Sequence, residues 1–288
     1  MTLRADLTHA VALARKAGAA ILAIKDQARS SPTQKADAQG PVTLADLAAD
    51  AVIREGLASS GDLVITEETW VQERPQGAAP AHTRVWMVDP LDGTEDFIAG
   101  RPDYAVHIGL CVDGVPVLGV IFQPEADRLW AGITAGAGRQ PLFVREFGAE
   151  RTHDARIAPV GDESRSARLA VSASHPSAFV DATLRNLGAT AVVRGSVGVK
   201  IGLIVDGDAD AYVTASRRIK VWDTCAPSAV LAAAGGMMTS LAGAPLEYGA
   251  GVAHRDGVCA WSAPVATWLG PRLAAALNHA RSRERGDG

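Results

Sequence analysis

The segment Asp89-Pro90-Leu91-Asp92-Gly93-Thr94 has the residue types and the spacing of an oxygen-rich metal site. It follows an apolar, strand-like stretch. Pro90 fixes φ and Gly93 frees it, so we expect a sharp turn that aims Asp89 and Asp92 into one small space. Two carboxylates held so close repel each other in a dry site, and oxygen ligands favour Mg²⁺ or Mn²⁺ over zinc. The alternative is a turn with two solvated aspartates, and the segment alone does not decide between them.

Three further acidic residues raise the same question, and each also has an ordinary structural explanation. Glu67 ends a short apolar stretch, where an exposed strand end is the simpler interpretation. Asp223 opens a predicted helix, where it can act as the N-cap. Asp46 lies three residues after Thr43, which is the spacing of a capping box. Residues 94–98 look like a first helical turn, whose N–H groups could hold a phosphate oxygen.

The composition is that of an ordinary soluble globular chain. Of 288 residues, 48% are hydrophobic and 21% are charged, so a core can form without disulfides or a structural metal. The net charge of −4 offers no basic surplus for a nucleic acid polymer or an anionic membrane. The first residues lack a signal-peptide core and no apolar run reaches about 18 residues, which favours a soluble, cytoplasmic protein. Three cysteines without a CxxC pair are expected to be buried free thiols: Cys111, Cys225 and Cys259.

Hydrophobic periodicity predicts helices packed on sheets, in two halves. Asp113-Gly114 is a strong hairpin signal, and residues 28–41 are expected to form a mobile loop. A polar stretch at 148–166 suggests an N-terminal half, residues 1–150, with most metal ligands, and a C-terminal half, residues 151–288, with the substrate contacts and Asp223. The predicted helices cover about 3–25, 43–57, 177–187, 199–205, 225–234 and 263–281, and the predicted strands 63–66, 85–88, 104–112, 115–122, 129–133, 169–172, 191–193 and 210–213.

Taken together, the acidic segments resemble the inositol monophosphatase superfamily in order and spacing, from about residue 5 to 270. The matching segments are Val42-Thr43-x-x-Asp46, Thr66-Glu67-Glu68, the Asp89–Thr94 segment, and Trp222-Asp223-Thr224 followed by Gly235-Gly236. The resemblance implies an α/β (α+β) fold, a layered αβαβα sandwich, and a Mg²⁺-dependent phosphatase. The branch most similar to this chain is the CysQ-like 3′(2′),5′-bisphosphate nucleotidases, through Gly93-Thr94-x-Asp96-Phe97-Ile98, Ser174-His175-Pro176 and Gly195–Lys200.

The resemblance also implies a role for each motif residue, together with two to three Mg²⁺ ions that Mn²⁺ can replace. The implied metal ligands are Glu67, Asp89, the carbonyl of Leu91, Asp92 and Asp223, with Asp89 bridging two ions. The implied catalytic residues are Glu67, Thr94, which orients the attacking water, and Asp46, which accepts a hydrogen bond from Thr94 or a metal-bound water. The implied substrate contacts are Gly93, Thr94, His175, Ser196, Lys200 and Asp223. His107, within an apolar strand, is instead expected to be a core residue.

The expected substrate is adenosine 3′,5′-bisphosphate, which would give AMP and phosphate. Glu95 stands where that branch commonly has Lys, and Ala173 where it often has Arg, so both remove positive charge. An inositol 1-monophosphatase or a broad sugar phosphatase, including one for fructose 1,6-bisphosphate, therefore stays open. A haloacid-dehalogenase-type phosphatase is disfavoured, because its two aspartates lie two residues apart, whereas Asp89 and Asp92 lie three residues apart. A catalytically silent metal-binding protein is disfavoured because the acidic residues and Thr94 are all retained.

The expected partner of the chain is a small phosphate ester. No nucleic acid polymer and no membrane is expected, and a homodimer is possible. The resemblance further implies inhibition by Li⁺, through displacement of a weakly held Mg²⁺.

Overall fold

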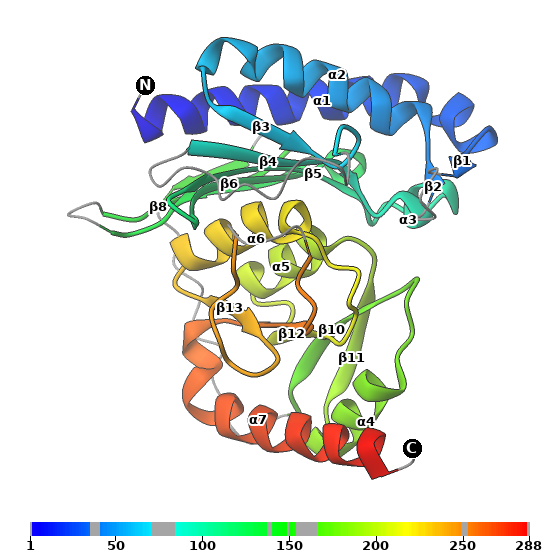
Figure 1. The fold of residues 1–288 in the computed structure, drawn as a ribbon, viewed down its shortest axis with the longest axis vertical. Coiled ribbons are helices and arrows are strands. Elements are labelled where there is room, and N and C mark those ends of the chain that lie inside the picture. The colour runs from blue at the N-terminus through cyan, green and yellow to red at the C-terminus, as the bar shows by residue number, and fades with distance from the viewer. Residues whose placement is uncertain are drawn as a thin grey trace.

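Five layers follow one another from the N-terminal helices to the C-terminal helix: helices, sheet, helices, sheet, helices (Figure 1). This αβαβα order is the predicted architecture. The computed structural model describes residues 2–34, 41–70, 84–136, 140–148, 150–153, 166–248 and 253–286.

The first two layers are a helix pair and a seven-stranded sheet. Helices α1 (Leu3–Ser30) and α2 (Leu44–Leu57) cover one face of the sheet. Strand β3 runs parallel to β4, and every later neighbouring pair is antiparallel. In sheet order the strands are β3 (Leu63–Thr66), β4 (Arg84–Asp92), β5 (Ala105–Val112), β6 (Val115–Gln123), β7 (Arg128–Ile133), β8 (Leu142–Phe147) and β9 (Glu150–His153).

Helix α1 is, among the described residues, the one helix long and apolar enough to be considered for a membrane span. Its apolar side chains, among them Leu7, Leu13 and Ile21, are buried in the core that α1 shares with α2 and the first sheet. A core helix of a soluble protein can have the same length and apolar composition, so these two properties do not identify a membrane span.

The last three layers surround a five-stranded sheet. Helices α5 (Val197–Asp206) and α6 (Val221–Ala233) lie between the two sheets, and α4 (Ala178–Leu187) and α7 (Ala263–Gly286) cover the outer face (Figure 1). In sheet order the strands are β11 (Thr190–Arg194), β10 (Arg168–Ser172), β12 (Ala211–Thr214), β14 (Val258–Trp261) and β13 (Met237–Ser240). The remaining short elements are β1 (Thr33–Gln34), β2 (Pro41–Val42), α3 (Thr94–Ile98) and two 3₁₀ turns, Ala58–Ser60 and Pro124–Ala126.

Several predictions of local structure are confirmed. Asp113 and Gly114 form the turn between β5 and β6 with φ of 53° and 76°. The three cysteines are buried and free. The predicted helix at 263–281 is α7, although it continues to Gly286.

Other predictions need correction. Asp223 is not an N-cap, because α6 begins at Val221 with Lys220 as N-cap and Asp223 is its third residue. Strands β8, β9, β13 and β14 were not predicted, and β9 falls within the polar stretch at 148–166. Residues 154–165 of that stretch and 35–40 of the predicted loop lie outside the described residues. The division at residue 150 stays a prediction.

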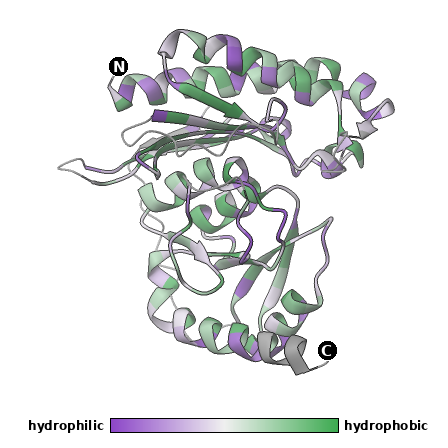
Figure 2. Cartoon of the chain, viewed as in Figure 1, coloured by the Kyte–Doolittle hydropathy of each residue, from purple (hydrophilic) through white to green (hydrophobic). Residues whose placement is uncertain are grey.

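Glycines allow α6 to approach the first sheet closely. A Cβ at Gly119 on β6 would lie 2.2 Å from the carbonyl oxygen of Ala226, and one at Gly109 on β5 would lie 2.7 Å from the backbone nitrogen of Ala226. A Cβ at Gly132 on β7 would be 2.5 Å from Cβ of Ala233. Figure 2 shows that α5 and α6 are largely hydrophobic, as helices covered by a sheet on each side should be. The position of α6 is therefore fixed by contacts of backbone against backbone.

A buried carboxylate at the C-terminal end of α5 ties this helix to the first sheet. Asp206 accepts hydrogen bonds from Trp130 Nε1 at 3.1 Å, from Arg128 at 2.8 Å and from Arg145 at 3.1 Å. Arg128 in turn stacks on the ring of Phe147. The end of α5 is thereby tied to β7 and β8.

We expect Gly119→Ala to destabilise the fold by about 1–3 kcal/mol, because the added Cβ forces α6 away from β6. Gly270→Ala is the matched control, since a Cβ there meets no atom within 4 Å and α7 gains a better helix former. Urea unfolding of both variants measures the difference. Equal free energies of unfolding for Gly119→Ala and wild type would contradict the close approach.

Candidate metal centre and substrate pocket

The parallel pairing of β3 with β4 brings Glu67 beside Asp89. Thr66 pairs with Val88, and the N–H of Glu67 donates to the carbonyl of Val88 at 3.1 Å. Because parallel strands end at the same edge, the residue that follows β3 lies next to Asp89. The two acidic strand ends that the sequence showed therefore lie side by side in the structure.

A β-bulge places Asp92 on the same side of β4 as Asp89. Residues three apart on a regular strand point to opposite faces. Here Asp89 pairs with His107 and Asp92 pairs with Ala105, so one extra residue is accommodated between the two aspartates. The backbone N–H of Leu91 donates to Asp89 Oδ1 at 3.0 Å and stabilises this turn. The expected convergence of the two aspartates thus comes from the bulge.

Helix α6 contributes the third acidic residue of the cluster. One carboxylate oxygen each from Glu67, Asp89 and Asp223 lie within 4.8 Å of one another, which is a spacing that one cation could bridge. Burial, and then the charges of Asp92 and Glu67, raise the pKa of Asp223 well above its ordinary value. The N–H of Lys220 opposes this by donating to Asp223 Oδ2 at 2.8 Å. Such crowded oxygen donors fit a hard divalent cation.

Asp92 binds the N-terminal end of α5. Its Oδ2 accepts from Ser196 Oγ at 2.6 Å, from the N–H of Val197 and from the N–H of Gly198 at 3.3 Å. Ser196 Oγ also accepts from the N–H of Val199, and Ser196 has φ of 45°, a region that non-glycine residues rarely occupy. Ser196 therefore positions Asp92, a role that the sequence interpretation as a substrate contact did not include.

Asp46 and Thr94 meet, as the resemblance implied. Asp46 Oδ2 accepts from the N–H and the hydroxyl of Thr43 at 2.8 and 2.6 Å, so the capping box is real. Its other oxygen, Oδ1, lies 3.0 Å from Thr94 Oγ1, which is also 3.1 Å from the carbonyl of Leu91. A hydroxyl has one hydrogen and can donate to only one of them. Burial raises the pKa of Asp46 to about 6, although the bonds from Thr43 and Thr94 oppose it.

His107 is buried, as predicted, but it also contacts the acidic cluster. Its Nε2 lies 3.3 Å from Asp92 Oδ2, and a Cβ at Gly198 would lie 2.1 Å from the same nitrogen. Burial lowers the pKa of His107 and favours the neutral ring. The imidazole thus fills the space behind Asp92. His107 lies near the acidic residues because it pairs with Asp89 across β4 and β5. The sequence does not reveal this pairing.

Lys200 is buried beneath the pocket. Its Nζ donates to the carbonyl of Gly195 at 3.1 Å and lies 5.2 Å from the ring centre of Tyr212. Burial lowers the pKa of Lys200 to about 8, although nearby carboxylates, Asp92 first, oppose the shift. The ammonium therefore stabilises the loop before α5. Its predicted contact with substrate stays a prediction.

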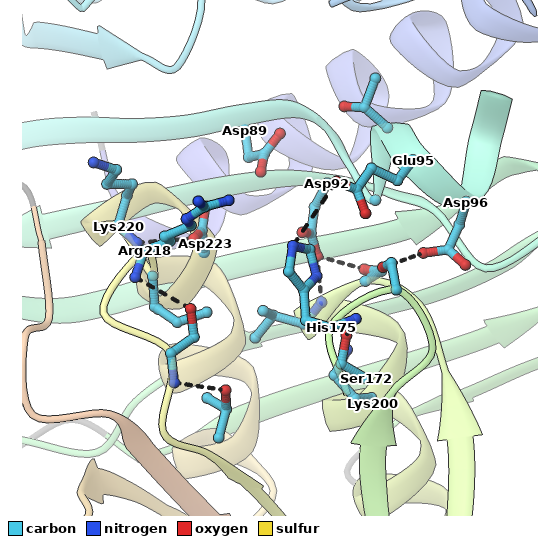
Figure 3. Close-up of a pocket in the computed structure, with 18 of the residues that line it drawn as sticks. Asp89, Asp92, Glu95, Asp96, Ser172, His175, Lys200, Arg218, Lys220 and Asp223 are labelled. Atoms are coloured by element: carbon cyan, nitrogen blue, oxygen red, sulfur yellow. Dashed lines mark hydrogen bonds and ion pairs between the residues drawn. The ribbon is translucent and has the colours of Figure 1, made fainter. Parts of the chain in front are cut away.

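The carboxylates line a cavity of about 190 Å³, whose lining also includes residues of the segments between β10 and α6 (Figure 3). Among the exposed lining residues, His175 Nε2 lies 3.8 Å from Glu95 Oε1, so the segment after β10 faces α3 there. Sequence reasoning missed several lining residues, above all the cations Arg218 and Lys220, which the basic run before Trp222 could have indicated. The predicted site residues that line the cavity are Glu67, Asp89, Leu91, Asp92, Gly93, Thr94, His175, Ser196, Lys200 and Asp223.

Comparisons with known proteins agree with this geometry. The model of the inositol monophosphatase family matches residues 3–282. The 3′(2′),5′-bisphosphate nucleotidase CysQ of Escherichia coli O157:H7 is 32% identical over 238 residues, which are 82% of this chain and 91% of that protein. The crystal structure of CysQ from Bacteroides thetaiotaomicron has a TM-score of 0.68 and 26% identity, and covers 90% of this chain and 97% of that one. The IMPase of Thermotoga maritima has a TM-score of 0.73 at 20% identity, with coverage of 98% and 99%.

We expect Mg²⁺ to raise the melting temperature of the wild type much more than that of Asp89→Asn, which loses the negative charge and one of the two oxygens of this carboxylate. At a Mg²⁺ concentration of about 100 times its Kd, the free energy of unfolding should increase by about 2.7 kcal/mol. The rise should be larger at pH 7.5 than at pH 5.5, because the raised pKa of Asp223 means that the cation displaces a proton at low pH.

Asp208→Asn is the control, since Asp208 is exposed and lies outside the pocket lining. It should respond to Mg²⁺ as the wild type does. Thermal melts at both pH values decide the matter. An unchanged Mg²⁺ response in Asp89→Asn would place the cation elsewhere.

Proposed function

The chain belongs to the inositol monophosphatase family, and from this premise we propose that it removes the 3′-phosphate of adenosine 3′,5′-bisphosphate, with Mg²⁺ as cofactor, to give AMP and phosphate. Family membership makes it a phosphoric monoester hydrolase. The cation, the substrate and the individual residue roles are our proposal.

The observation that supports a bound divalent cation is the excess of negative charge in the pocket. Six carboxylates line it, against the basic side chains of Lys200, Arg218 and Lys220. A phosphate ester would be repelled by such a lining unless cations neutralised it. The oxygen donors of Glu67, Asp89 and Asp223 fit Mg²⁺, or Mn²⁺ in its place. When bound, such ions neutralise charge on the phosphoryl oxygens and activate water.

The residues of the chain have separate tasks in this proposal. Glu67, Asp89, Asp92, Asp223 and the carbonyl of Leu91 would hold two to three ions, the third held more weakly and sensitive to Li⁺. Thr94 would orient the attacking water, since its hydroxyl is held beside Asp46 Oδ1. Asp46 would accept the hydrogen of Thr94 and so direct the lone pairs of the hydroxyl toward the water.

Two lines support a nucleotide as substrate. Relatives over most of this chain are named 3′(2′),5′-bisphosphate nucleotidases. The pocket also extends from the β4 turn to the segment before α6, so it has room beyond one phosphate. Gly93, with φ of 96°, Thr94 and Asp223 would contact the phosphate that is hydrolysed. The rest of the substrate would contact three other lining residues, His175, Ser196 and Lys200.

We further propose that the enzyme is soluble and cytoplasmic, and that its partner is the small ester alone. The buried apolar face of α1 supports solubility. A homodimer stays a proposal.

A substrate panel tests the proposed function. With Mg²⁺ present, kcat/KM should be higher for adenosine 3′,5′-bisphosphate than for inositol 1-phosphate or fructose 1,6-bisphosphate, and a chelator should abolish every activity because the donors are hard oxygens. Phosphate release measures each rate, and Asp89→Asn is the inactive control. A preference for inositol 1-phosphate would overturn the nucleotide substrate. Full activity after exhaustive chelation would overturn the cation.

A further inference from the structure

Arg218 is a cationic side chain of the pocket that no motif singled out. It lies on the segment that joins β12 to α6, on the α6 side of the pocket, opposite His175 and Lys200 (Figure 3). Its side chain is exposed. Although six carboxylates line the same pocket, Arg218 forms no ion pair with any residue in the described part of the chain. Its charge is therefore available to a ligand.

The backbone that carries Arg218 is held in place. The N–H of Arg218 donates to Ser216 Oγ at 3.2 Å, and the N–H of Ser216 donates to Thr214 Oγ1 at 3.2 Å. The carbonyl of Ile219 accepts from the N–H of His254 at 2.8 Å, which ties the segment to a neighbouring stretch. The guanidinium thus projects from a fixed base.

The other two cations of the pocket are less exposed than Arg218. Lys200 is buried and donates to the carbonyl of Gly195 at 3.1 Å. Lys220 is half-buried at the N-cap of α6, where its backbone N–H donates to Asp223 and its charge opposes the rise in the pKa of that carboxylate. Of the cations that line the pocket, Arg218 alone is both exposed and unpaired among the described residues.

We infer that Arg218 binds a second anionic group of the substrate, distinct from the phosphate that is hydrolysed, and so sets the preference for a bisphosphate. This assignment rests on the proposed phosphatase activity. It gives the specificity role to Arg218 rather than to Lys200, which is one of the substrate contacts that the resemblance implied. A guanidinium is suited to the role, because its planar fork can donate two hydrogen bonds to one phosphate. The scissile phosphate would lie toward Asp89 and Thr94, which line the pocket at the end of β4.

A matched pair of substrates isolates the second anion. Adenosine 3′,5′-bisphosphate and adenosine 3′-monophosphate share the 3′-phosphate and differ only at the 5′ position. Arg218→Met should raise KM about tenfold for the bisphosphate, the loss of one charge-assisted contact. It should change KM about twofold or less for the monophosphate, and kcat should stay near that of the wild type for both.

The chain provides two informative controls. Arg217 is exposed and next in sequence but does not line the pocket, so Arg217→Met should leave both substrates unchanged. Arg218→Lys keeps the charge and should restore most of the preference. Unchanged melting temperatures show that each variant is folded.

Failure of this inference differs from failure of the proposed function. Equal effects of Arg218→Met on both adenosine substrates, or no effect on either, would overturn the role of Arg218. A wild type that prefers fructose 1,6-bisphosphate would overturn only the proposal of a nucleotide substrate. Fructose 1,6-bisphosphate and fructose 1-phosphate would then replace the two adenosine substrates in the comparison. A wild type that gains nothing from a second phosphate in either pair would overturn the inference outright.

Discussion

Mutual repulsion among carboxylates is the constraint on which the site depends. Glu67, Asp89 and Asp223 each place an oxygen within 4.8 Å of the others, and Asp92 is close enough to raise the pKa of Asp223. Like charges at such distances in a partly dry pocket cost several kcal/mol unless protons or cations neutralise them. Protons can do this at low pH, and in the proposed function a divalent cation would do it at neutral pH, with the carboxylates as its ligands.

The scaffold holds these groups together against their repulsion. The parallel pair β3–β4 sets Glu67 beside Asp89, and the glycines of β5 and β6 let α6 bring Asp223 to them. The N-terminal end of α5 offsets the charge of Asp92 through backbone N–H groups. Each contact crosses between segments that are distant in sequence, so the site exists only in the assembled chain.

Local chemistry was predictable from the sequence, and long-range placement was not. The capping box at Thr43 and the turn at Asp113 depend on neighbouring residues, and both were predicted correctly. The N-cap offered as the ordinary explanation of Asp223 is wrong, because an acid near a helix start fits the N-cap and the third position alike. The basic run before Trp222 marks Arg218 as a charge, but that Arg218 and Lys200 line one pocket with the acidic residues of the first sheet depends on long-range packing, which no local pattern encodes.

Crystals of the wild type saturated with Mn²⁺ test the central claim most directly, because anomalous scattering locates the ion without reference to activity. A cation that relieves the repulsion must bind between the carboxylates of Glu67, Asp89 and Asp223. The predicted result is an anomalous peak at that position, bonded to oxygen donors of all three residues. No peak between these carboxylates in a Mn²⁺-saturated crystal at neutral pH would contradict it.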